Sequence, residues 1–146
     1  MGIVFFCLFL LSTKTKIMYT FIQKFHSGWA YLALALLLFA VINALMGKSS
    51  GREFTARDRK IGLFALIASH IQLVVGLVLY FGFQKEMRLS SLEHPIATIT
   101  AIILITIGWS KHKKNEASDA KFKSFLIFYS LGLLFIFSCI PWHLWL

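Results

Sequence analysis

Cysteine and acidic residues are scarce in this sequence, and both shortages exclude kinds of site. Of 146 residues, two are cysteine and six are acidic. Cys7 and Cys139 lie far apart in apolar runs, without C-x-x-C, C-x-x-C-H or zinc-ligand spacing, which argues against covalent c-type heme attachment and metal-thiolate sites. We expect both to be small buried hydrophobic residues. No Asp or Glu falls within the apolar stretches described below and no inverted repeat is visible, so a proton-coupled transporter is disfavoured.

Charge is also scarce, and the composition predicts a membrane protein. Charged residues make up 14% of the chain and hydrophobic residues 58%, with a mean hydropathy of +0.76. A soluble domain carries roughly a quarter charged residues. The extramembrane segments are too short for a separate soluble catalytic or DNA-binding domain. We therefore interpret the net charge of +9 as basic loops beside a lipid bilayer, and we expect no nucleic-acid partner.

Four apolar stretches are long enough to span a bilayer, which takes about 20 residues. They cover residues 19–46, 61–83, 94–109 and 122–145, and most charged residues lie between them. The sequence thus predicts an all-α fold, an integral membrane four-helix bundle in one transmembrane domain of residues 18–146. The third span is the shortest. We expect it to begin at His94, because Pro95 suits a first helical position.

Residues 1–17 form an N-terminal extension that begins with an apolar run of residues 1–12, too short to span. It fits a poor signal sequence, an interfacial segment, or upstream sequence translated ahead of a native start at Met18. We favour the last interpretation, because Met18 opens directly onto the first span.

The distribution of basic residues predicts the orientation. Ten Lys and Arg residues lie in the first and third connections, residues 47–60 and 111–123, and five lie on the opposite face. The positive-inside rule places the ten-charge face in the cytoplasm and both termini outside. We expect a multi-pass protein of the bacterial inner membrane.

Histidines within a span are functional-site hypotheses, because ionisable groups there are costly. His26 lies about two turns below the outer surface on the first span, at about 1.5 Å per residue, and His94 opens the third span at a similar level. Two imidazoles at matched depth on two helices are what a bis-histidine heme requires. We predict that His26 and His94 ligate the iron of one heme b.

The faces that carry these histidines are rich in small residues. At helical spacing, the stripe that begins at His26 continues through Ala30, Ala33, Leu37, Ala40 and Ala44. The stripe that begins at His94 continues through Ala97, Thr98, Ala101, Ile105 and Gly108. Small residues leave room for a cofactor, and they also form close helix–helix seams. Second ligands for another heme are absent at the expected positions further along both spans, which favours one heme over two.

The other histidines are less clear. His70 lies deeper, on the side of its helix away from Gln72, and fits an alternative heme ligand, a hydrogen-bonding group near the macrocycle, or a contact in a homo-oligomer. The small and polar face of that helix holds Ala65, Ala68, Ser69, Gln72 and Gly76. We expect His112 to lie in a solvated basic end and His143 at the membrane interface.

Charged residues near the outer level complete the candidate cofactor site. Lys24, Lys85 and Arg88 lie where heme propionates would emerge, although interfacial lysines and arginines also snorkel without a ligand. Glu93, beside His94, is a candidate acceptor for an imidazole N–H.

Several segments carry a family resemblance, and they are Phe25-His26-Ser27-Gly28-Trp29-Ala30, Ser69-His70-Ile71-Gln72-Leu73-Val74-Val75-Gly76-Leu77, Glu93-His94-Pro95 and Ile107-Gly108-Trp109-Ser110. From Met18 onward the chain resembles small bacterial membrane proteins labelled cytochrome b. More distantly, the order of a histidine, Gln-x-x-x-Gly and a second histidine is similar to one half of heme A synthase, which implies His26 and His94 as axial ligands and an outward-facing heme edge. That enzyme has Glu and Arg where this chain has Gln23 and Ser27, and a duplicated half that is missing here, so synthase activity is disfavoured.

Two functional hypotheses follow. The first is a b-type cytochrome that transfers electrons near the respiratory chain, with a redox partner that the sequence does not identify. The second is a non-enzymatic membrane subunit or assembly factor without heme, whose histidines and Gln72 make interhelical hydrogen bonds.

Overall fold

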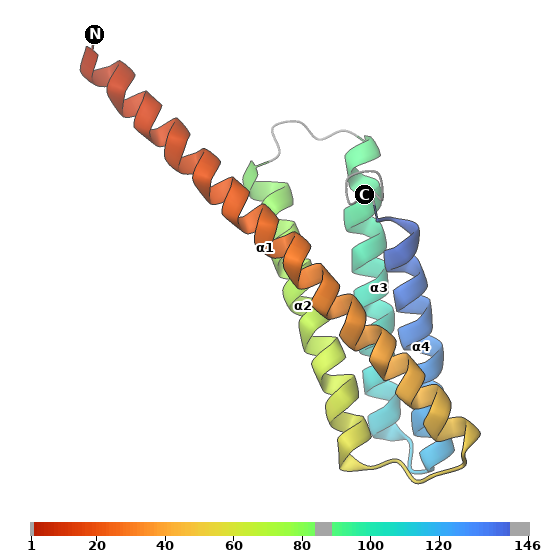
Figure 1. The fold of residues 1–146 in the computed structure, drawn as a ribbon. Helices are drawn as coiled ribbons and strands as arrows, with labels where there is room; N and C mark the ends of the chain where they lie inside the picture. The colour runs from red at the N-terminus through yellow and green to blue at the C-terminus, as the bar shows by residue number, and fades with distance from the viewer. Residues whose placement is uncertain (1, 84–88, 141–146) are drawn as a thin grey trace.

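The protein is an all-α bundle of four long helices. The computed structural model describes residues 2–83 and 89–140, and it places the side chains of residues 13–83 and 92–140. The helices within these residues are α1 (Gly2–Ser49), α2 (Ala56–Phe83), α3 (Leu89–Lys114) and α4 (Ser118–Ser138) (Figure 1). All four are long and apolar enough to cross a membrane, which confirms the predicted fold class and the four spans.

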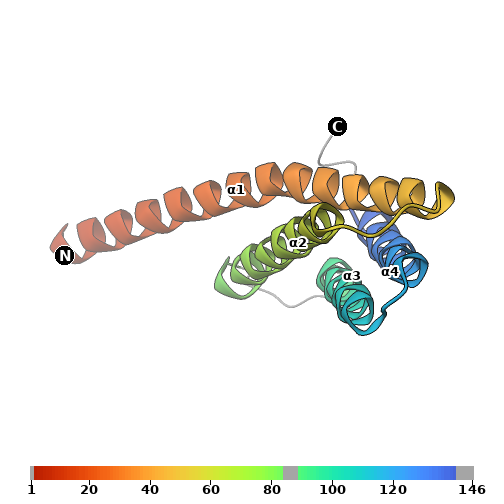
Figure 2. The same ribbon diagram turned by 90° about the horizontal axis from the view of Figure 1, so that it is seen from below.

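The order of packing places α1 and α3 on opposite sides of the bundle. α1 packs against α2 and α4, and α3 packs against α2 and α4. Figure 2 views the bundle from the end that carries the α1–α2 and α3–α4 connections. In this view α1 lies across α2 and α4, and α3 lies on their other side. Side chains from α1 and α3 can therefore meet only across the centre of the bundle.

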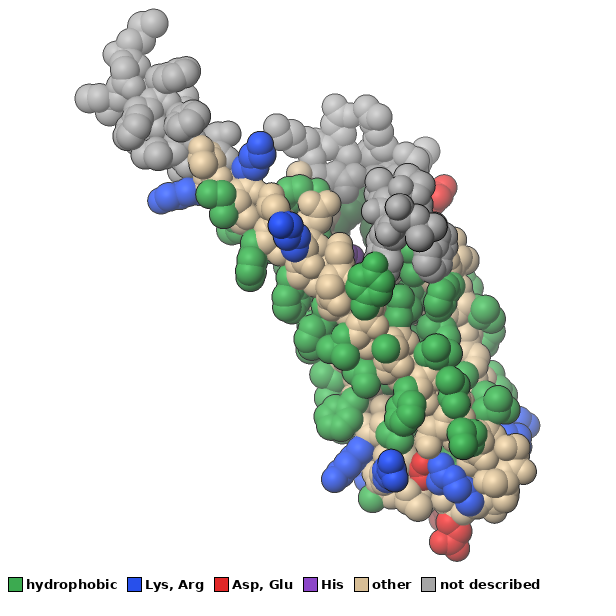
Figure 3. Space-filling view, viewed as in Figure 1, with side chains coloured by type: hydrophobic (Ala, Val, Ile, Leu, Met, Phe, Trp, Pro, Cys, Tyr) green, Lys and Arg blue, Asp and Glu red, His purple; other side chains and the backbone are tan. Residues whose placement is uncertain are grey.

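The loop end of the bundle carries two short connections, residues 50–55 and 115–117. Gly51 has a φ of 61° just after α1, a conformation that glycine adopts without steric cost. Hydrophobic side chains cover the visible face between the two ends, and Lys and Arg gather at the loop end and along the early part of α1 (Figure 3). This distribution matches a bundle whose sides contact lipid.

The predicted small-residue stripes are buried. Ala30, Ala33, Leu37, Ala40 and Ala44 of α1 are all 7% exposed or less. On α3, Ala97, Ala101 and Ile105 are also buried. Part of the second stripe forms a close seam, because a Cβ added at Gly108 would lie 2.7 Å from Phe128 Cβ and 3.2 Å from the Ser124 carbonyl oxygen. The helix–helix interpretation thus holds for the loop end of α3.

The predicted start of the third helix is wrong. α3 begins at Leu89, so His94 lies within it and Pro95 occupies its second turn. The five residues before His94 contain no helix breaker, and the helix continues through them. Proline has no N–H, so the Ser91 carbonyl has no intrahelical donor at that position. The predicted fourth span extended to residue 145; α4 ends at Ser138, and residues 141–146 lie outside the described part of the chain.

Candidate functional site

His26 lies on α1 with its ring packed against α2. A Cβ added at Gly76 would lie 3.0 Å from His26 Cε1, so only glycine leaves room for the ring in this position. The Gln72 amide nitrogen donates to the His26 carbonyl at 3.0 Å and lies 3.3 Å from His26 Nε2. One turn further along α1, Trp29 Nε1 donates to the Ala68 carbonyl at 2.9 Å. These contacts fix α1 against the predicted small and polar face of α2.

His94 projects from α3 and is oriented by α4. Its Nδ1 lies 2.9 Å from the Cys139 carbonyl oxygen. Because a carbonyl can only accept, Nδ1 carries the hydrogen and Nε2 is the basic nitrogen of the neutral ring. Metal-binding histidines characteristically donate their other N–H to a carbonyl or carboxylate in this way. The predicted acceptor Glu93 is exposed, and the Cys139 carbonyl takes that role instead.

The two histidine rings meet across the bundle, at the matched depth that the sequence predicted. Their ring centroids are 6.5 Å apart and the ring planes are inclined at 83°, an edge-to-face arrangement. The Cε1, Nδ1 and Nε2 atoms of His26 lie beside Gly76, and Nε2 lies 3.3 Å from the Gln72 amide nitrogen. A metal ion shared by the two rings therefore requires the His26 ring to turn away from Gly76.

Two adjoining cavities meet at this pair. Both are lined by His26, Gln72, His94 and Thr98. The first, called the outer cavity, lies nearer the end of the bundle away from the short connections. It has a volume of 390 Å³ and adds polar side chains such as Gln23 and Tyr80. The inner cavity has a volume of 220 Å³ and adds apolar residues, among them Ala30, Ala33, Ile102 and Ile136. Together they fall in the size range of small-molecule sites, about 300–1,000 Å³.

Buried polar atoms without a partner gather at the same place. Among the described side chains these atoms are His26 Nδ1, Gln72 Oε1 and Tyr80 Oη, and all three residues line the outer cavity. A buried polar atom without a hydrogen bond costs roughly 1–3 kcal/mol. Three such atoms at one cavity make it the candidate functional site among the described residues.

His70 lies outside this cluster, on the α2 side that faces α3. Its Nδ1 donates to the Leu66 carbonyl at 2.8 Å, and its Nε2 lies 3.4 Å from Thr106 Oγ1. His70 thus makes hydrogen-bond contacts within α2 and toward α3, and its three interpretations, as an alternative heme ligand, a hydrogen-bonding group near the macrocycle or an oligomer contact, stay predictions. Its separation from Gln72 on the helix surface is as the sequence predicted.

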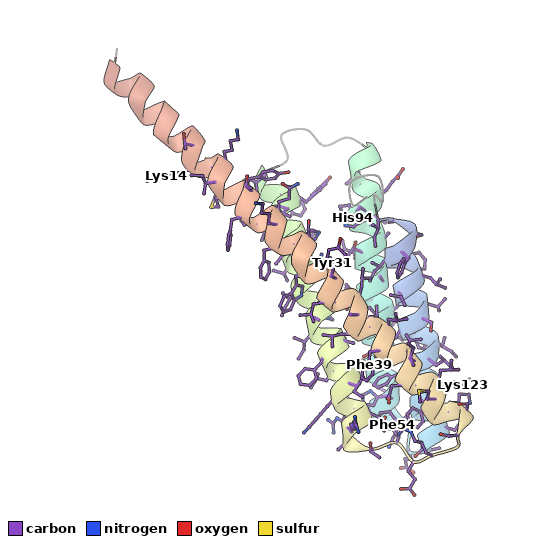
Figure 4. All side chains as sticks on the ribbon, in the orientation of Figure 1. Lys14, Tyr31, Phe39, Phe54, His94 and Lys123 are labelled. Atoms are coloured by element: carbon purple, nitrogen blue, oxygen red, sulfur yellow. The ribbon has the colours of Figure 1, made fainter. Side chains whose placement is uncertain are left out.

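The prediction for His112 is wrong. Its side chain is 3% exposed, and its ring packs on Phe54, Trp109 and Phe125. The connection after α1 folds over the end of α3 and places Phe54 above the imidazole, a contact between distant segments that local charge does not reveal. Figure 4 marks Phe54 near the loop end and His94 near the opposite end.

The remaining predicted site residues are distributed as follows. Lys24 is exposed on α1, in the same region of the bundle as the cavities. Lys85, Arg88 and His143 lie outside the side chains that the structure describes, as does Cys7. Cys139 is half-buried.

Tyr80 is the polar cavity residue with a buried, unpartnered atom that the sequence did not identify. Its hydroxyl is buried at the outer end of α2, although the residue stands in an aromatic run, Tyr80-Phe81, that resembles an interfacial belt. The helical spacing could have indicated its position, because Tyr80 follows Gln72 and Gly76 on the small and polar face of α2.

Comparison of the chain with protein-family models gives no match. Comparisons with curated proteins and with solved structures likewise give none.

Proposed function

We propose that the protein is an integral membrane b-type cytochrome that holds one heme between His26 and His94 and transfers single electrons. The observation that carries the proposal is the outer cavity, which brings together the two neighbouring imidazoles and every buried polar side-chain atom without a partner among the described residues. The family resemblance of the histidine-bearing segments supports the same assignment.

The roles of the residues follow from their contacts. His26 and His94 would hold the iron from α1 and α3, which lie diagonally across the bundle. Gly76 admits the His26 ring, and the Cys139 carbonyl keeps the basic nitrogen of His94 available. When bound to two histidines, a heme supplies one-electron redox chemistry at a six-coordinate iron.

The two cavities differ in a way that suits an amphipathic macrocycle. The inner cavity is lined by small and aliphatic side chains, which exclude water. The outer cavity adds the hydroxyl of Tyr80 and the amide of Gln23, groups that can hydrogen-bond acidic substituents. Tyr80 and Gln23 would therefore hydrogen-bond the acidic groups of a bound heme, and the aliphatic residues of the inner cavity would contact its apolar part.

The proposal includes an orientation and a location. The loop end carries ten of the 15 Lys and Arg residues, which supports placing it in the cytoplasm of a bacterium, with the bundle in the inner membrane and the heme site near the outer face. Electrons would then pass to or from a respiratory-chain partner near that face.

The first experiment is a visible spectrum of detergent-purified protein made with ample heme, oxidised and reduced, with pyridine hemochrome quantification. We expect sharp reduced bands of a low-spin b heme at about one per chain. Folded protein that stays colourless under these conditions would overturn the proposal and favour the subunit or assembly-factor hypothesis.

Histidine variants test the ligand assignment. His26→Ala and His94→Ala should each lose bound heme while remaining folded. His70→Ala is the matched control, because it removes an imidazole from the bundle outside the cavity, and it should retain heme. Heme loss in His70→Ala together with retention in His94→Ala would show that the iron is held elsewhere.

A further inference from the structure

A second hollow lies at the loop end, at the opposite end of the bundle from the histidine cavities. It has a volume of 530 Å³, and its lining includes Phe54, Thr55, Arg59, His112, Lys113 and Lys121. The loop between α1 and α2, the first turn of α2, the last turns of α3 and the first turn of α4 all contribute to it.

Three cations from three helices converge on this hollow: Arg59 from α2, Lys113 from α3 and Lys121 from α4. In the described part of the chain, the two ion pairs use other cations, since Lys48 pairs with Asp119 and Arg52 with Asp58. Among the described residues, the three cations of the hollow thus have no ion pair with a carboxylate. Like charges held close together raise the free energy unless an anion neutralises them.

The hollow has a rigid aromatic base that positions the cations. The Phe54 backbone N–H donates to Ser118 Oγ at 2.9 Å, and the Phe54 ring packs on Phe122 at a centroid distance of 5.0 Å. Lys121 Nζ lies 5.8 Å from the Phe54 ring centroid, and Lys113 Nζ lies 5.1 Å from that of Trp109. Cations held over ring faces lose less conformational freedom when an anion binds.

The position of the hollow identifies its ligand. The three helices continue from it directly into their apolar spans, so the cations lie at the level of lipid headgroups. Basic pockets between membrane helices at this level bind the phosphates of anionic lipids. Arginine can hold two oxygens of a phosphate at once, and lysines add point charges.

We propose that this hollow is a binding site for the phosphate group of an anionic phospholipid, held by Arg59, Lys113 and Lys121. The site is independent of the heme proposal, because it shares no residue with the histidine cavities and needs no cofactor. A bound lipid would bridge α2, α3 and α4 at the loop end.

Native mass spectrometry of the full chain in detergent tests the site. The probes are phosphatidylglycerol, phosphatidylcholine with the same acyl chains, and inorganic phosphate. The test variant is Arg59→Gln/Lys113→Gln/Lys121→Gln. The control, Arg57→Gln/Lys60→Gln/Lys114→Gln, removes the same charges from exposed positions at the same end that do not line the hollow.

We expect the wild type to retain phosphatidylglycerol over phosphatidylcholine. The test variant should lose on the order of 10- to 100-fold in phosphatidylglycerol affinity, and the control less than about threefold. Equal losses in both variants, or equal binding of the two lipids by the wild type, would overturn the site. Inorganic phosphate that binds as tightly as the lipid would overturn the lipid assignment. Should the test variant not fold, Arg59→Gln is compared with Arg57→Gln by the same criteria.

Discussion

Tyr80 places a hydroxyl in the outer cavity without a hydrogen-bond partner among the described residues. A phenol can bury its ring in an apolar span, but its O–H loses the hydrogen bonds that water provided. Phenylalanine would fill the same space without that cost. Under the heme proposal, the hydroxyl would donate a hydrogen bond to an acidic group of the cofactor.

Tyr80→Phe should weaken hemin binding by about 10- to 150-fold, the loss of one hydrogen bond to a charged group. The control ligand is hemin dimethyl ester, whose blocked carboxylates should bind the wild type and the variant with equal affinity. The variant without cofactor should be as thermally stable as the wild type, because no internal hydrogen bond is removed. A similar loss for both ligands would show that Tyr80 acts by packing, and failure of both to bind the wild type would reject the heme site itself.

At the scale of elements, the most polar feature of the bundle is the start of α2. Asp58 is 2% exposed and accepts hydrogen bonds of 2.6–2.8 Å from Arg52, Asn43 and Thr55. Thr55 and Asp58 occupy the positions of a capping box, in which each side chain approaches the other's backbone N–H. The cluster joins α1, the connection and α2.

Asp58→Ala should lower the free energy of unfolding by about 1–3 kcal/mol, because it leaves the Asn43 amide nitrogen without its acceptor and removes the Asp58 hydrogen bonds of Arg52 and Thr55. Arg52, whose side chain is 38% exposed, keeps Asn43 Oδ1 and the Glu53 carbonyl as acceptors. Asp119→Ala is the matched control. It removes the partner of Lys48 in a pair whose Asp119 side chain is 65% exposed, and such pairs contribute about 0–1 kcal/mol. Thermal or detergent-induced unfolding followed by circular dichroism measures both variants. Equal effects would contradict the assigned role of the buried cluster.

The seam between α3 and α4 depends on glycine. A Cβ at Gly132 would lie 2.7 Å from Ile105 Cγ1 and 3.1 Å from the Ala101 carbonyl oxygen, and a backbone oxygen cannot move unless the helices separate. Gly132→Ala should therefore destabilise the bundle by about 1–3 kcal/mol. Gly28→Ala is the control, since nothing lies within 4 Å of its added Cβ, and better helix propensity should make it neutral or more stable by up to about 1 kcal/mol. Similar unfolding midpoints for the two variants would show that the seam is not close-packed.

At the scale of the whole molecule, the sequence predicted what depends on hydropathy and helical period. The four spans, the buried stripe from Ala30 to Ala44 and the matched depth of His26 and His94 follow from those two regularities. Contacts between distant segments did not follow. Burial of His112 depends on Phe54 crossing from another connection, and the orientation of His94 depends on the Cys139 carbonyl.

The arrangement of the whole bundle places the start of α1 and the end of α4 at one end and both short connections at the other (Figure 1). Fluorescent protein inserted between Glu116 and Ala117, in the connection that carries neither Phe54 nor the partners of Asp58, should fluoresce in a bacterial host, because the ten-charge end is expected in the cytoplasm. Alkaline phosphatase fused after the last residue should be active, since it would lie outside. The control replaces five Lys and Arg residues of the loop end with Gln, which reduces the charge difference and should yield mixed orientations. If fluorescent protein fused at the C-terminus of the wild type fluoresces instead, the predicted orientation is wrong and the histidine site lies at the cytoplasmic face.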